Sequence, residues 1–385
     1  MEAQVDERKS AALAEANLRV EDGAQKVTTF AAAREMLRHT QVLQDGAGAD
    51  EVDVGDPEQV PVFYLDGKPH KTRRAAIARF FTPRAISERY QAVMEATTDR
   101  LLADFRARGE ARLDEISFEL AVAVASKIVG LSQSDPHEMA PRIAVLLRAS
   151  FNNAKGLARW KNLLLRSWYG YRFYVKDVRP AVRVRREEPG EDIISQCLAK
   201  GYSDKAIMIE CMTYATAGMV TTREFIVMVA WYMFERDELR ADFLAADEER
   251  QFAILLEILR LEPIAALLYR RSAQDLPETC LGALREGARF VVDMRAVNAD
   301  ETAVGACPHA LDPDRAKGQQ GTFMSFGDGA HHCPGWQVAL HETRIFIDRL
   351  LRVPGVAMVK PPEMLWNAPL MSYELRDAQV RCTTL

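Results

Sequence analysis

The chain has 385 residues, of which 48% are hydrophobic and 27% are charged, and its formal net charge is −5. This balance is typical of a folded globular protein and excludes an intrinsically disordered chain. The acidic net charge also argues against nucleic acid or an anionic membrane as a partner.

The sequence favours a cytoplasmic protein without disulfides. The first twenty residues are charged and rich in alanine, and they lack the apolar core of a signal peptide. The longest apolar stretch, residues 207–234, carries Arg223 and Glu224 near its middle, which argues against a membrane span. None of the six cysteines forms a CxxC pair or a zinc-like spacing with histidine.

In chain order, the sequence predicts a small hairpin, a helical bulk and a few late strands. Residues 18–20 and 25–28 suit the hairpin, residues 31–38 a helix, and the acidic, Gly-rich residues 44–59 a loop. Helical periodicity follows at 71–80, 84–106, 114–130, 137–152, 155–174, 177–187, 236–242, 248–261 and 336–352. Strands are expected at 265–272, 357–360, 371–375 and 380–383.

A long helix is expected over residues 204–234, where Ser203 can cap its start. It would be about 46 Å long. Because it is apolar on nearly every face, it should cross the protein interior. Gly218 at its middle is less favourable than alanine by about 1 kcal/mol, which calls for a reason. Either Gly218 permits close helix packing while nearby hydroxyls bond back to carbonyls, or the helix opens there for function.

The segment 325–335, SFGDGAHHCPG, precedes a helix that Pro334 suits at its first turn. Gly327 and Gly329 allow positive φ angles and a close approach of the backbone to another group. Cys333 would lie where unpaired N–H groups and the helix dipole stabilise a thiolate. A flat cofactor held by one axial sulfur would need such a glycine-rich wall. The alternative is a glycine-rich turn with an incidental cysteine.

This segment resembles the haem-binding loop of the cytochrome P-450 superfamily. The family pattern is Phe, two residues, Gly, one residue, His or Arg, one residue, Cys, one residue and Gly, and its places are held here by Phe326, Gly329, His331, Cys333 and Gly335. The resemblance implies that Cys333 ligates the iron of haem b (iron protoporphyrin IX) and that Phe326 packs beside the sulfur. It implies that His331 bonds a propionate and that Gly335 lets the helix pass close to the porphyrin. Thiolate ligation favours O–O cleavage.

Upstream motifs match the family in the right order. Glu257 and Arg260 resemble its Glu-x-x-Arg motif, which implies a buried structural ion pair. His70 and Arg74, one helical turn apart, resemble its third-helix region, and Arg271 matches another of its arginines. The resemblance implies that these last three hold propionates, since charge-assisted bonds offset the desolvation of carboxylates. Taken singly, each could be a solvent-facing basic residue.

The middle of the long helix resembles the family's oxygen-binding motif. The implied catalytic region consists of Ala217, Gly218, Thr221 and Thr222, with Thr221 donating a hydrogen bond where O2 sits. The family usually carries an acid before this threonine, and this chain has Val220. Proton delivery would then use Thr221 with ordered water, or Glu224 or Thr222, or the reaction would need fewer protons.

A second departure from the family precedes the Cys333 segment. Ala310 stands where the family has the arginine that joins the Glu257–Arg260 pair, and Leu311 replaces an aromatic residue. His309 or Arg315 could compensate.

We therefore expect the superfamily's mainly α fold with a small β region, as one domain over residues 1–385, with haem between the 204–234 helix and Cys333. The expected enzyme is a monooxygenase that inserts one oxygen atom from O2 into a hydrophobic small molecule of terpenoid, steroid or aromatic type. A separate ferredoxin or flavodoxin-type donor with its reductase would supply electrons. By matching position, the substrate pocket is expected to include Val60, Val62, Phe63, Met219, Ile264, Leu267, Leu370 and Met371. Core packing explains these apolar residues equally well.

Three other interpretations remain. Val220 also suits a haem-thiolate enzyme of different chemistry, namely peroxide-driven oxidation, oxidative coupling, desaturation or rearrangement. The protein could instead be a haem-binding sensor or carrier that activates nothing. The last is a helical protein without haem, against which four ordered motifs argue.

Overall fold

The computed structural model describes residues 24–45, 56–150, 156–315, 323–367 and 370–384. Its α-helices are α2 (Phe30–Arg38), α3 (Gly67–Ala78), α4 (Pro83–Ala85), α5 (Gln91–Arg108), α6 (Leu113–Val129), α7 (Pro136–Ser150), α8 (Leu157–Phe173), α9 (Arg179–Glu187), α10 (Ile193–Ala199), α11 (Asp204–Tyr214), α12 (Thr221–Glu235), α13 (Asp237–Ala245), α14 (Glu248–Leu261), α15 (Met294–Asn298), α16 (Glu301–Val304) and α18 (Trp336–Leu351). Three segments have wider π-helical turns: η5 (Ile86–Tyr90), η6 (Tyr174–Val178) and η7 (Ala215–Val220).

The strands form three small sheets. They are β1 (Gln25–Val27), β2 (Val42–Gln44), β3 (Glu110–Arg112), β4 (Leu267–Ser272), β5 (Arg289–Asp293), β6 (Ala357–Lys360), β7 (Glu363–Asn367), β8 (Ser372–Arg376) and β9 (Gln379–Arg381). The largest sheet has the order β1-β5-β4-β2, in which β1 and β5 run parallel and the other neighbours antiparallel. The second sheet has the order β3-β9-β6, and β7 and β8 form a hairpin.

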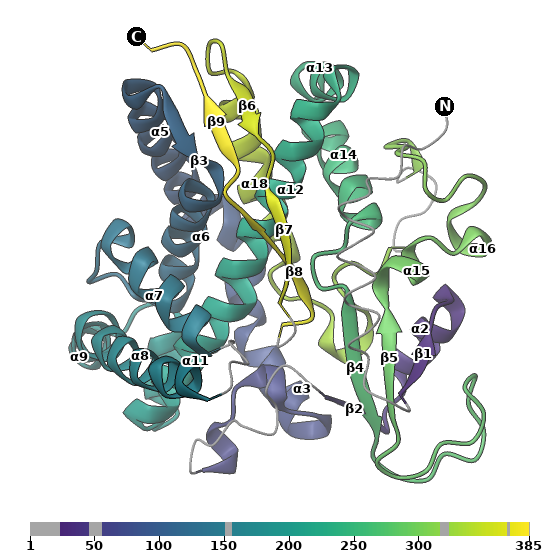
Figure 1. The fold of residues 1–385 in the computed structure, drawn as a ribbon. Coiled ribbons are helices and arrows are strands. Elements are labelled where there is room, and N and C mark those ends of the chain that lie inside the picture. The colour runs from purple at the N-terminus through teal and green to yellow at the C-terminus, as the bar shows by residue number, and fades with distance from the viewer. Residues whose placement is uncertain (1–23, 46–55, 151–155, 316–322, 368–369, 385) are drawn as a thin grey trace.

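Figure 1 confirms the mainly α fold with a small β region. Helices α5 to α9 lie on the left and α12 passes through the middle, while the sheet of β1, β2, β4 and β5 lies at the lower right with α2 beside it. Of the helices within the described ranges, none combines the length and the apolar character that crossing a membrane requires.

The predicted long helix is present as α11, η7 and α12, one after the other. The Ser203 hydroxyl caps α11 by accepting a hydrogen bond from the backbone N–H of Ala206 at 3.2 Å. Every residue from 222 to 233 is buried, because α12 packs against α6 and α18. Arg223 and Glu224, the two charges that argued against a membrane span, are therefore buried inside the protein.

The predicted Glu257–Arg260 pair is buried on α14 and fixes the chain before the Cys333 segment. The Arg260 guanidinium donates to both carboxylate oxygens of Glu257, at 2.8 and 2.7 Å. It also donates to three backbone carbonyl oxygens, those of Asn298 (2.9 Å), Pro308 (2.6 Å) and Ala310 (3.2 Å). One helical side chain thus organises two separate loops.

Arg315, and not His309, occupies the place of the missing arginine. The Arg315 Nε lies 3.5 Å from Glu257 Oε1, and its guanidinium donates to the carbonyl oxygens of Val304 and Cys307. The side chain is 7% exposed, whereas His309 is exposed to solvent. Of the two residues that could replace the family's arginine, Arg315 is therefore the one that contacts Glu257.

The first expected hairpin is only partly described. Residues 25–27 do form a strand, β1, which pairs in parallel with β5 so that Gln25 lies opposite Phe290. Residues 18–20, the other half of the hairpin, lie outside the described residues. The expected loop at 44–59 contains the end of β2 and a short 3-10 turn at Pro57–Gln59, and its residues 46–55 also lie outside.

Candidate functional site

The segment 326–335 forms a tight loop against α2. Gly327 and Gly329 have φ angles of 74° and 67°, as the glycine pattern predicted. A Cβ atom on Gly329 would meet the carbonyl oxygen of Leu37, so only glycine fits there. The Asp328 carboxylate accepts two hydrogen bonds from Arg38, both at 3.0 Å, which fastens the loop to α2.

Cys333 lies just before α18 and is held by backbone hydrogen bonds. Its N–H donates to the carbonyl oxygen of Phe326 at 2.8 Å. Burial raises the pKa of the thiol above its usual value, while the N–H of Gly335 and the charge of Arg74 lower it in part. The expected helix-terminus effect is thus present but does not outweigh burial. A metal ion would add the missing stabilisation, since a coordinating thiol loses its proton outright.

Basic side chains from two elements meet beside this loop. The His70 and His331 rings lie 4.3 Å apart, and the Arg74 guanidinium donates to the carbonyl oxygen of His332. The pKa of His70 falls to about 4, first because of burial and then because of the neighbouring His331 and Arg74. Asp66 lies 3.0 Å from His331 Nε2 and is the carboxylate of this group. The structure therefore brings together the three predicted residues His70, Arg74 and His331.

The predicted Arg271 does not join this cluster. Its side chain lies on the exposed face of β4, and its neighbour Arg270 lies on the buried face, because side chains alternate along a strand. Burial lowers the pKa of Arg270 to about 10, although Asp66 and Asp45 oppose this shift. Arg270 donates to the carbonyl oxygen of Tyr269 at 2.7 Å. Arg270, one residue earlier, is therefore the arginine that faces inward.

An opened helix lies at the predicted position on the central helix. The turn of η7 covers Ala217 and Gly218, and the Thr221 hydroxyl donates to the carbonyl oxygen of Ala217 at 2.7 Å. Among the described residues, no atom of another element lies within 4 Å of the place where a Cβ of Gly218 would be, so close helix packing does not explain this glycine. Ala217 is exposed and Thr221 half-buried, although they lie in the middle of an interior helix. This face of the helix therefore borders open space.

Val220 and Glu224 are both buried and contribute to the packing of the central helix. Val220 is 3% exposed and belongs to the main core. The Glu224 carboxylate, which is fully buried, accepts hydrogen bonds from Arg223 (2.6 Å), from Arg376 (2.8 Å) and from the backbone N–H of Leu375 (2.7 Å). Glu224 thus fastens α12 to β8 and is already engaged. The suggestion that it delivers protons finds no support here, and Thr222 is likewise buried.

The expected pocket residues fall into two groups. Met219 and Ile264 are buried in the main core, against which Val60, Val62 and Leu370 also pack. Leu267 belongs to a smaller cluster that Met371 contacts. Met371 has a positive φ of 51° at the turn before β8, and Phe63 stacks edge-on against Tyr64. The structure does not bring all eight into one cavity.

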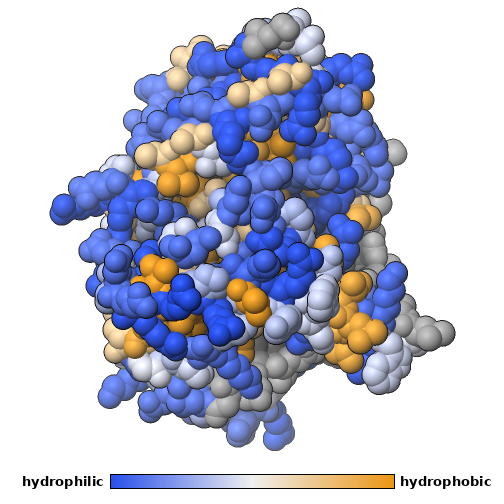
Figure 2. Space-filling view, turned by 90° about the vertical axis from the view of Figure 1, so that its left-hand side faces the viewer, coloured by the Kyte–Doolittle hydropathy of each residue, from blue (hydrophilic) through white to orange (hydrophobic). Residues whose placement is uncertain are grey.

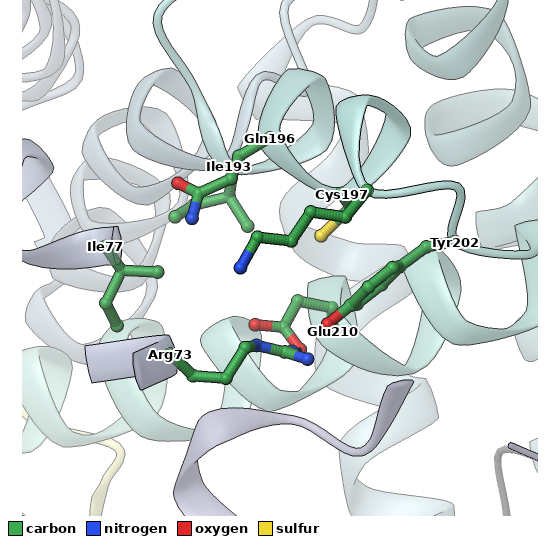
Figure 3. A pocket seen from close by; sticks show the side chains of 8 residues that line it. Arg73, Ile77, Ile193, Gln196, Cys197, Tyr202 and Glu210 are labelled. Atoms are coloured by element: carbon green, nitrogen blue, oxygen red, sulfur yellow. Dashed lines mark ion pairs between the residues drawn. The ribbon is translucent and has the colours of Figure 1, made fainter. Parts of the chain in front are cut away.

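A small cavity that the sequence did not reveal lies beside α3, lined by polar and apolar side chains. Figure 3 shows Arg73, Gln196, Tyr202 and Glu210 around it. Its volume of about 10 Å³ suits a single water molecule. Burial raises the pKa of Glu210 to about 7, while Arg73, 3.5 Å away, opposes that shift. His70 and Arg74 thus belong to one cluster, and Arg73 between them belongs to another.

Comparison with known proteins places this site in a family. The Cytochrome P450 family model matches residues 252–360. The chain is 26% identical to nocardicin C N-oxygenase of Nocardia uniformis subsp. tsuyamanensis, over 83% of this chain and 79% of the relative. It is 27% identical to cytochrome P-450 monooxygenase DoxA of Streptomyces sp. strain C5, over 88% and 84% of the two chains.

Solved structures agree with this assignment of the fold. The crystal structure of CalO2 matches with a TM-score of 0.78 and 22% identity, over 99% of this chain and 98% of the other. P450BioI, solved in complex with an acyl carrier protein ligated to hexadec-9Z-enoic acid, matches with a TM-score of 0.77 and 18% identity, over 97% and 98%.

The helical fold, the loop around Cys333 and the opened central helix match the features that the family uses to hold haem. Together, the family model, the curated relatives and the structural neighbours support the bacterial cytochrome P450 superfamily, and several of the similar proteins are named cytochrome P450s or monooxygenases.

Proposed function

We propose that the Cys333 thiolate would ligate the iron of haem b and that the whole chain, as one domain, serves oxygen insertion. The position of the Cys333 sulfur is the observation that carries this proposal, because it is half-buried in a hydrogen-bonded loop beside a basic cluster. His70, Arg74 and His331 lie close together, and their protonated forms repel one another. A planar group with two negative charges fits this place, because it would neutralise that repulsion. Thiolate-ligated haem, when bound, supplies reductive activation of O2.

The chain's own residues would hold the two propionates. His70, Arg74, His331 and Arg270 are the candidates, with Arg270 taking the role first expected of Arg271. Burial lowers the pKa values of Arg74 and Arg270, which means that their charges lack full compensation. Carboxylates would supply it through charge-assisted hydrogen bonds. Phe326 and Gly335 would border the sulfur, and the N–H of Gly335 points at it.

On the opposite side, Ala217, Gly218 and Thr221 would leave room for O2 and substrate. The Thr221 hydroxyl proton is held on the Ala217 carbonyl oxygen, so the hydroxyl oxygen can accept a hydrogen bond from a water molecule. With Val220 in place of an acid, ordered water at Thr221 would have to relay protons to the reacting oxygen. Closing this space to bulk solvent protects such a relay.

The substrate would be a hydrophobic small molecule of terpenoid, steroid or aromatic type. Val60, Val62, Phe63, Met219, Ile264, Leu267, Leu370 and Met371 remain the expected lining. The similar proteins include one named nocardicin C N-oxygenase and one named steroid C26-monooxygenase, so the family tolerates varied substrates. A separate ferredoxin or flavodoxin-type protein with its reductase would deliver electrons in the cytoplasm.

The absorption spectrum of the dithionite-reduced protein with carbon monoxide tests the proposal. We expect a strongly red-shifted Soret band that Cys333→Ala abolishes and that Cys197→Ala, at a buried cysteine elsewhere, leaves intact. A band at the shorter wavelength of histidine-ligated haem would contradict thiolate ligation. Turnover with a reconstituted electron donor and substrate-dependent product formation then distinguishes an oxygenase from a sensor.

A second candidate function follows from Val220 and Glu224. Because Glu224 is engaged by two arginines and a backbone N–H, it is not free to replace the acid that the family usually has before this threonine. The chemistry could then be peroxide-driven, coupling, desaturating or rearranging. Val220→Asp separates the two candidates. If hydroxylation and its coupling to electron use both rise, proton supply limited a hydroxylase; unchanged or lost turnover favours the second candidate.

A further inference from the structure

The outer face of α8 carries an apolar surface that the core does not explain. Of the seven large apolar side chains that are exposed among the described residues, five lie on this one helix. They are Trp160, Leu163, Leu164, Trp168 and Tyr171, with exposures of 66%, 48%, 70%, 58% and 62%. Figure 2 views the side of the molecule on which α7, α8 and α9 lie, and apolar groups appear in orange across its lower half. We call these five residues the α8 surface.

The α8 surface has the spacing of a helix-packing ridge. Trp160, Leu164 and Trp168 follow one another at intervals of four residues, which aligns them in a row along the helix. The opposite face of α8 is already occupied, since Phe173 is buried and a Cβ on Gly170 would lie 3.8 Å from both Leu146 of α7 and Met208 of α11. The ridge is therefore free to enter the groove of another helix.

Uncompensated positive charge borders this ridge on both sides. Arg159, Lys161, Arg166 and Arg172 lie on α8, which contains no Asp or Glu. Within the described part of the chain, none of the four forms an ion pair within 4.0 Å, whereas surface arginines elsewhere do, for example Arg352 with Asp348 at 2.8 Å. Exposed aromatic residues with arginines are typical of the centre of a protein interface.

We propose that the α8 surface is a docking site for an acidic partner protein, which presents a helix with apolar side chains flanked by carboxylates. The partner's carboxylates would pair with the four cations, and its apolar row would cover Trp160, Leu164 and Trp168. A second copy of the chain is the wrong occupant, because two such helices would bring eight like charges together. An anionic bilayer is also disfavoured, since the rest of the chain carries a net charge of −9 (−5 less the +4 of this helix).

The α8 surface is connected to the candidate site through helix α11. The inner face of α8 contacts Met208 on α11, and α11 leads directly into η7, where Ala217 and Gly218 border the open space. A partner on α8 therefore sits over the side of the molecule on which O2 and substrate would bind. The inference does not depend on the identity of the substrate.

Binding of two synthetic peptides to the haem-loaded full-length protein tests this. One is an amphipathic helix with leucines on one face and glutamates at its flanks; the other has lysine at each glutamate position. Fluorescence anisotropy of the dye-labelled peptides should show at least about tenfold tighter binding of the acidic peptide, weakened by salt. The double substitution L164S/W168S should weaken that binding by about tenfold or more. Leu365→Ser, which removes a 51% exposed leucine on β7, is the matched control and should change nothing.

Charge reversal provides a second variant that leaves the apolar ridge intact. Lys161→Glu with Arg166→Glu should reverse the preference, so that the lysine peptide binds better than the acidic one. Equal binding of the two peptides to the wild-type protein, or no saturable binding of either, would overturn the proposal. Tighter binding to phosphatidylglycerol-containing vesicles than to the acidic peptide would also overturn it, in favour of a membrane. Concentration-dependent dimerisation that L164S/W168S abolishes would overturn it in favour of self-association.

Discussion

Replacing Arg315 by alanine should destabilise the protein far more than its place outside the named helices and strands suggests. Arg315 is 7% exposed, and its guanidinium donates to the carbonyl oxygens of Val304 and Cys307 while lying 3.5 Å from Glu257. A hydrogen bond from a charged group is worth about 1.5–3 kcal/mol, and carbonyls left without a donor add to the loss. Glu257 keeps Arg260, so the full penalty of an unpaired buried charge does not arise. We expect a decrease of about 2–4 kcal/mol in the free energy of unfolding.

Urea unfolding of the haem-loaded protein, followed by far-ultraviolet circular dichroism, measures this decrease. Arg352→Ala is the matched control, because Arg352 forms an ion pair with Asp348 at 2.8 Å but is 54% exposed. An exposed pair contributes about 1 kcal/mol or less. If Arg315→Ala and Arg352→Ala have the same effect, Arg315 does not stabilise the Glu257–Arg260 pair, and the argument that it replaces the family's arginine is refuted.

Three further predictions concern the site and a buried acid. Arg270→Ala should lose haem to apomyoglobin several times faster than the wild-type protein, and Arg271→Ala should not. The opposite order would show that Arg271, and not Arg270, binds a propionate. Gly218→Ala should raise the unfolding free energy of the haem-free protein by about 1 kcal/mol, because the new Cβ meets no atom of another described element within 4 Å. The same substitution should weaken carbon monoxide binding to the haem-loaded protein. A lower unfolding free energy would indicate that Gly218 is required for packing instead. Burial raises the pKa of Glu342 from 4.5 to about 8, so the native state holds a proton there that the unfolded state releases, and stability falls as pH rises between these values. Glu342→Gln should therefore match the wild type near pH 5 and exceed it by up to about 4 kcal/mol near pH 8 in urea unfolding, and equal stability at both pH values would contradict this.

The residues that act through local chemistry were predictable from the sequence. Gly327 and Gly329 take the positive φ angles that their spacing predicted, and Ser203 caps the helix that follows it. The central helix opens at Gly218 because the residue types there already disfavour a regular helix. These features depend on a few neighbouring residues, so the sequence contains enough information to locate them.

Features that depend on distant pairing were not predictable. Arg270 and Arg271 are chemically identical neighbours, and only the pairing of β4 with β5 decides which one faces inward. No strand was expected at residues 289–293, so the register between β4 and β5 was unknown. The role of Arg315 likewise depends on Glu257, 58 positions earlier in the chain, which no local pattern reveals. The apolar lining of the pocket was uncertain because core residues and pocket residues have the same composition.

The parallel pairing of β1 with β5 affects how the chain folds while it is being made. Val27 lies opposite Val292 in the largest sheet, so β1 has no partner until about 260 more residues have been translated. At a bacterial rate of elongation, this delay lasts roughly 13–50 s. During that time Phe30 and Leu37, which later share a hydrophobic cluster with Phe290, lack that partner on the nascent chain. Strand β1 is therefore among the last strands of this sheet to pair, although it is translated well before its partner.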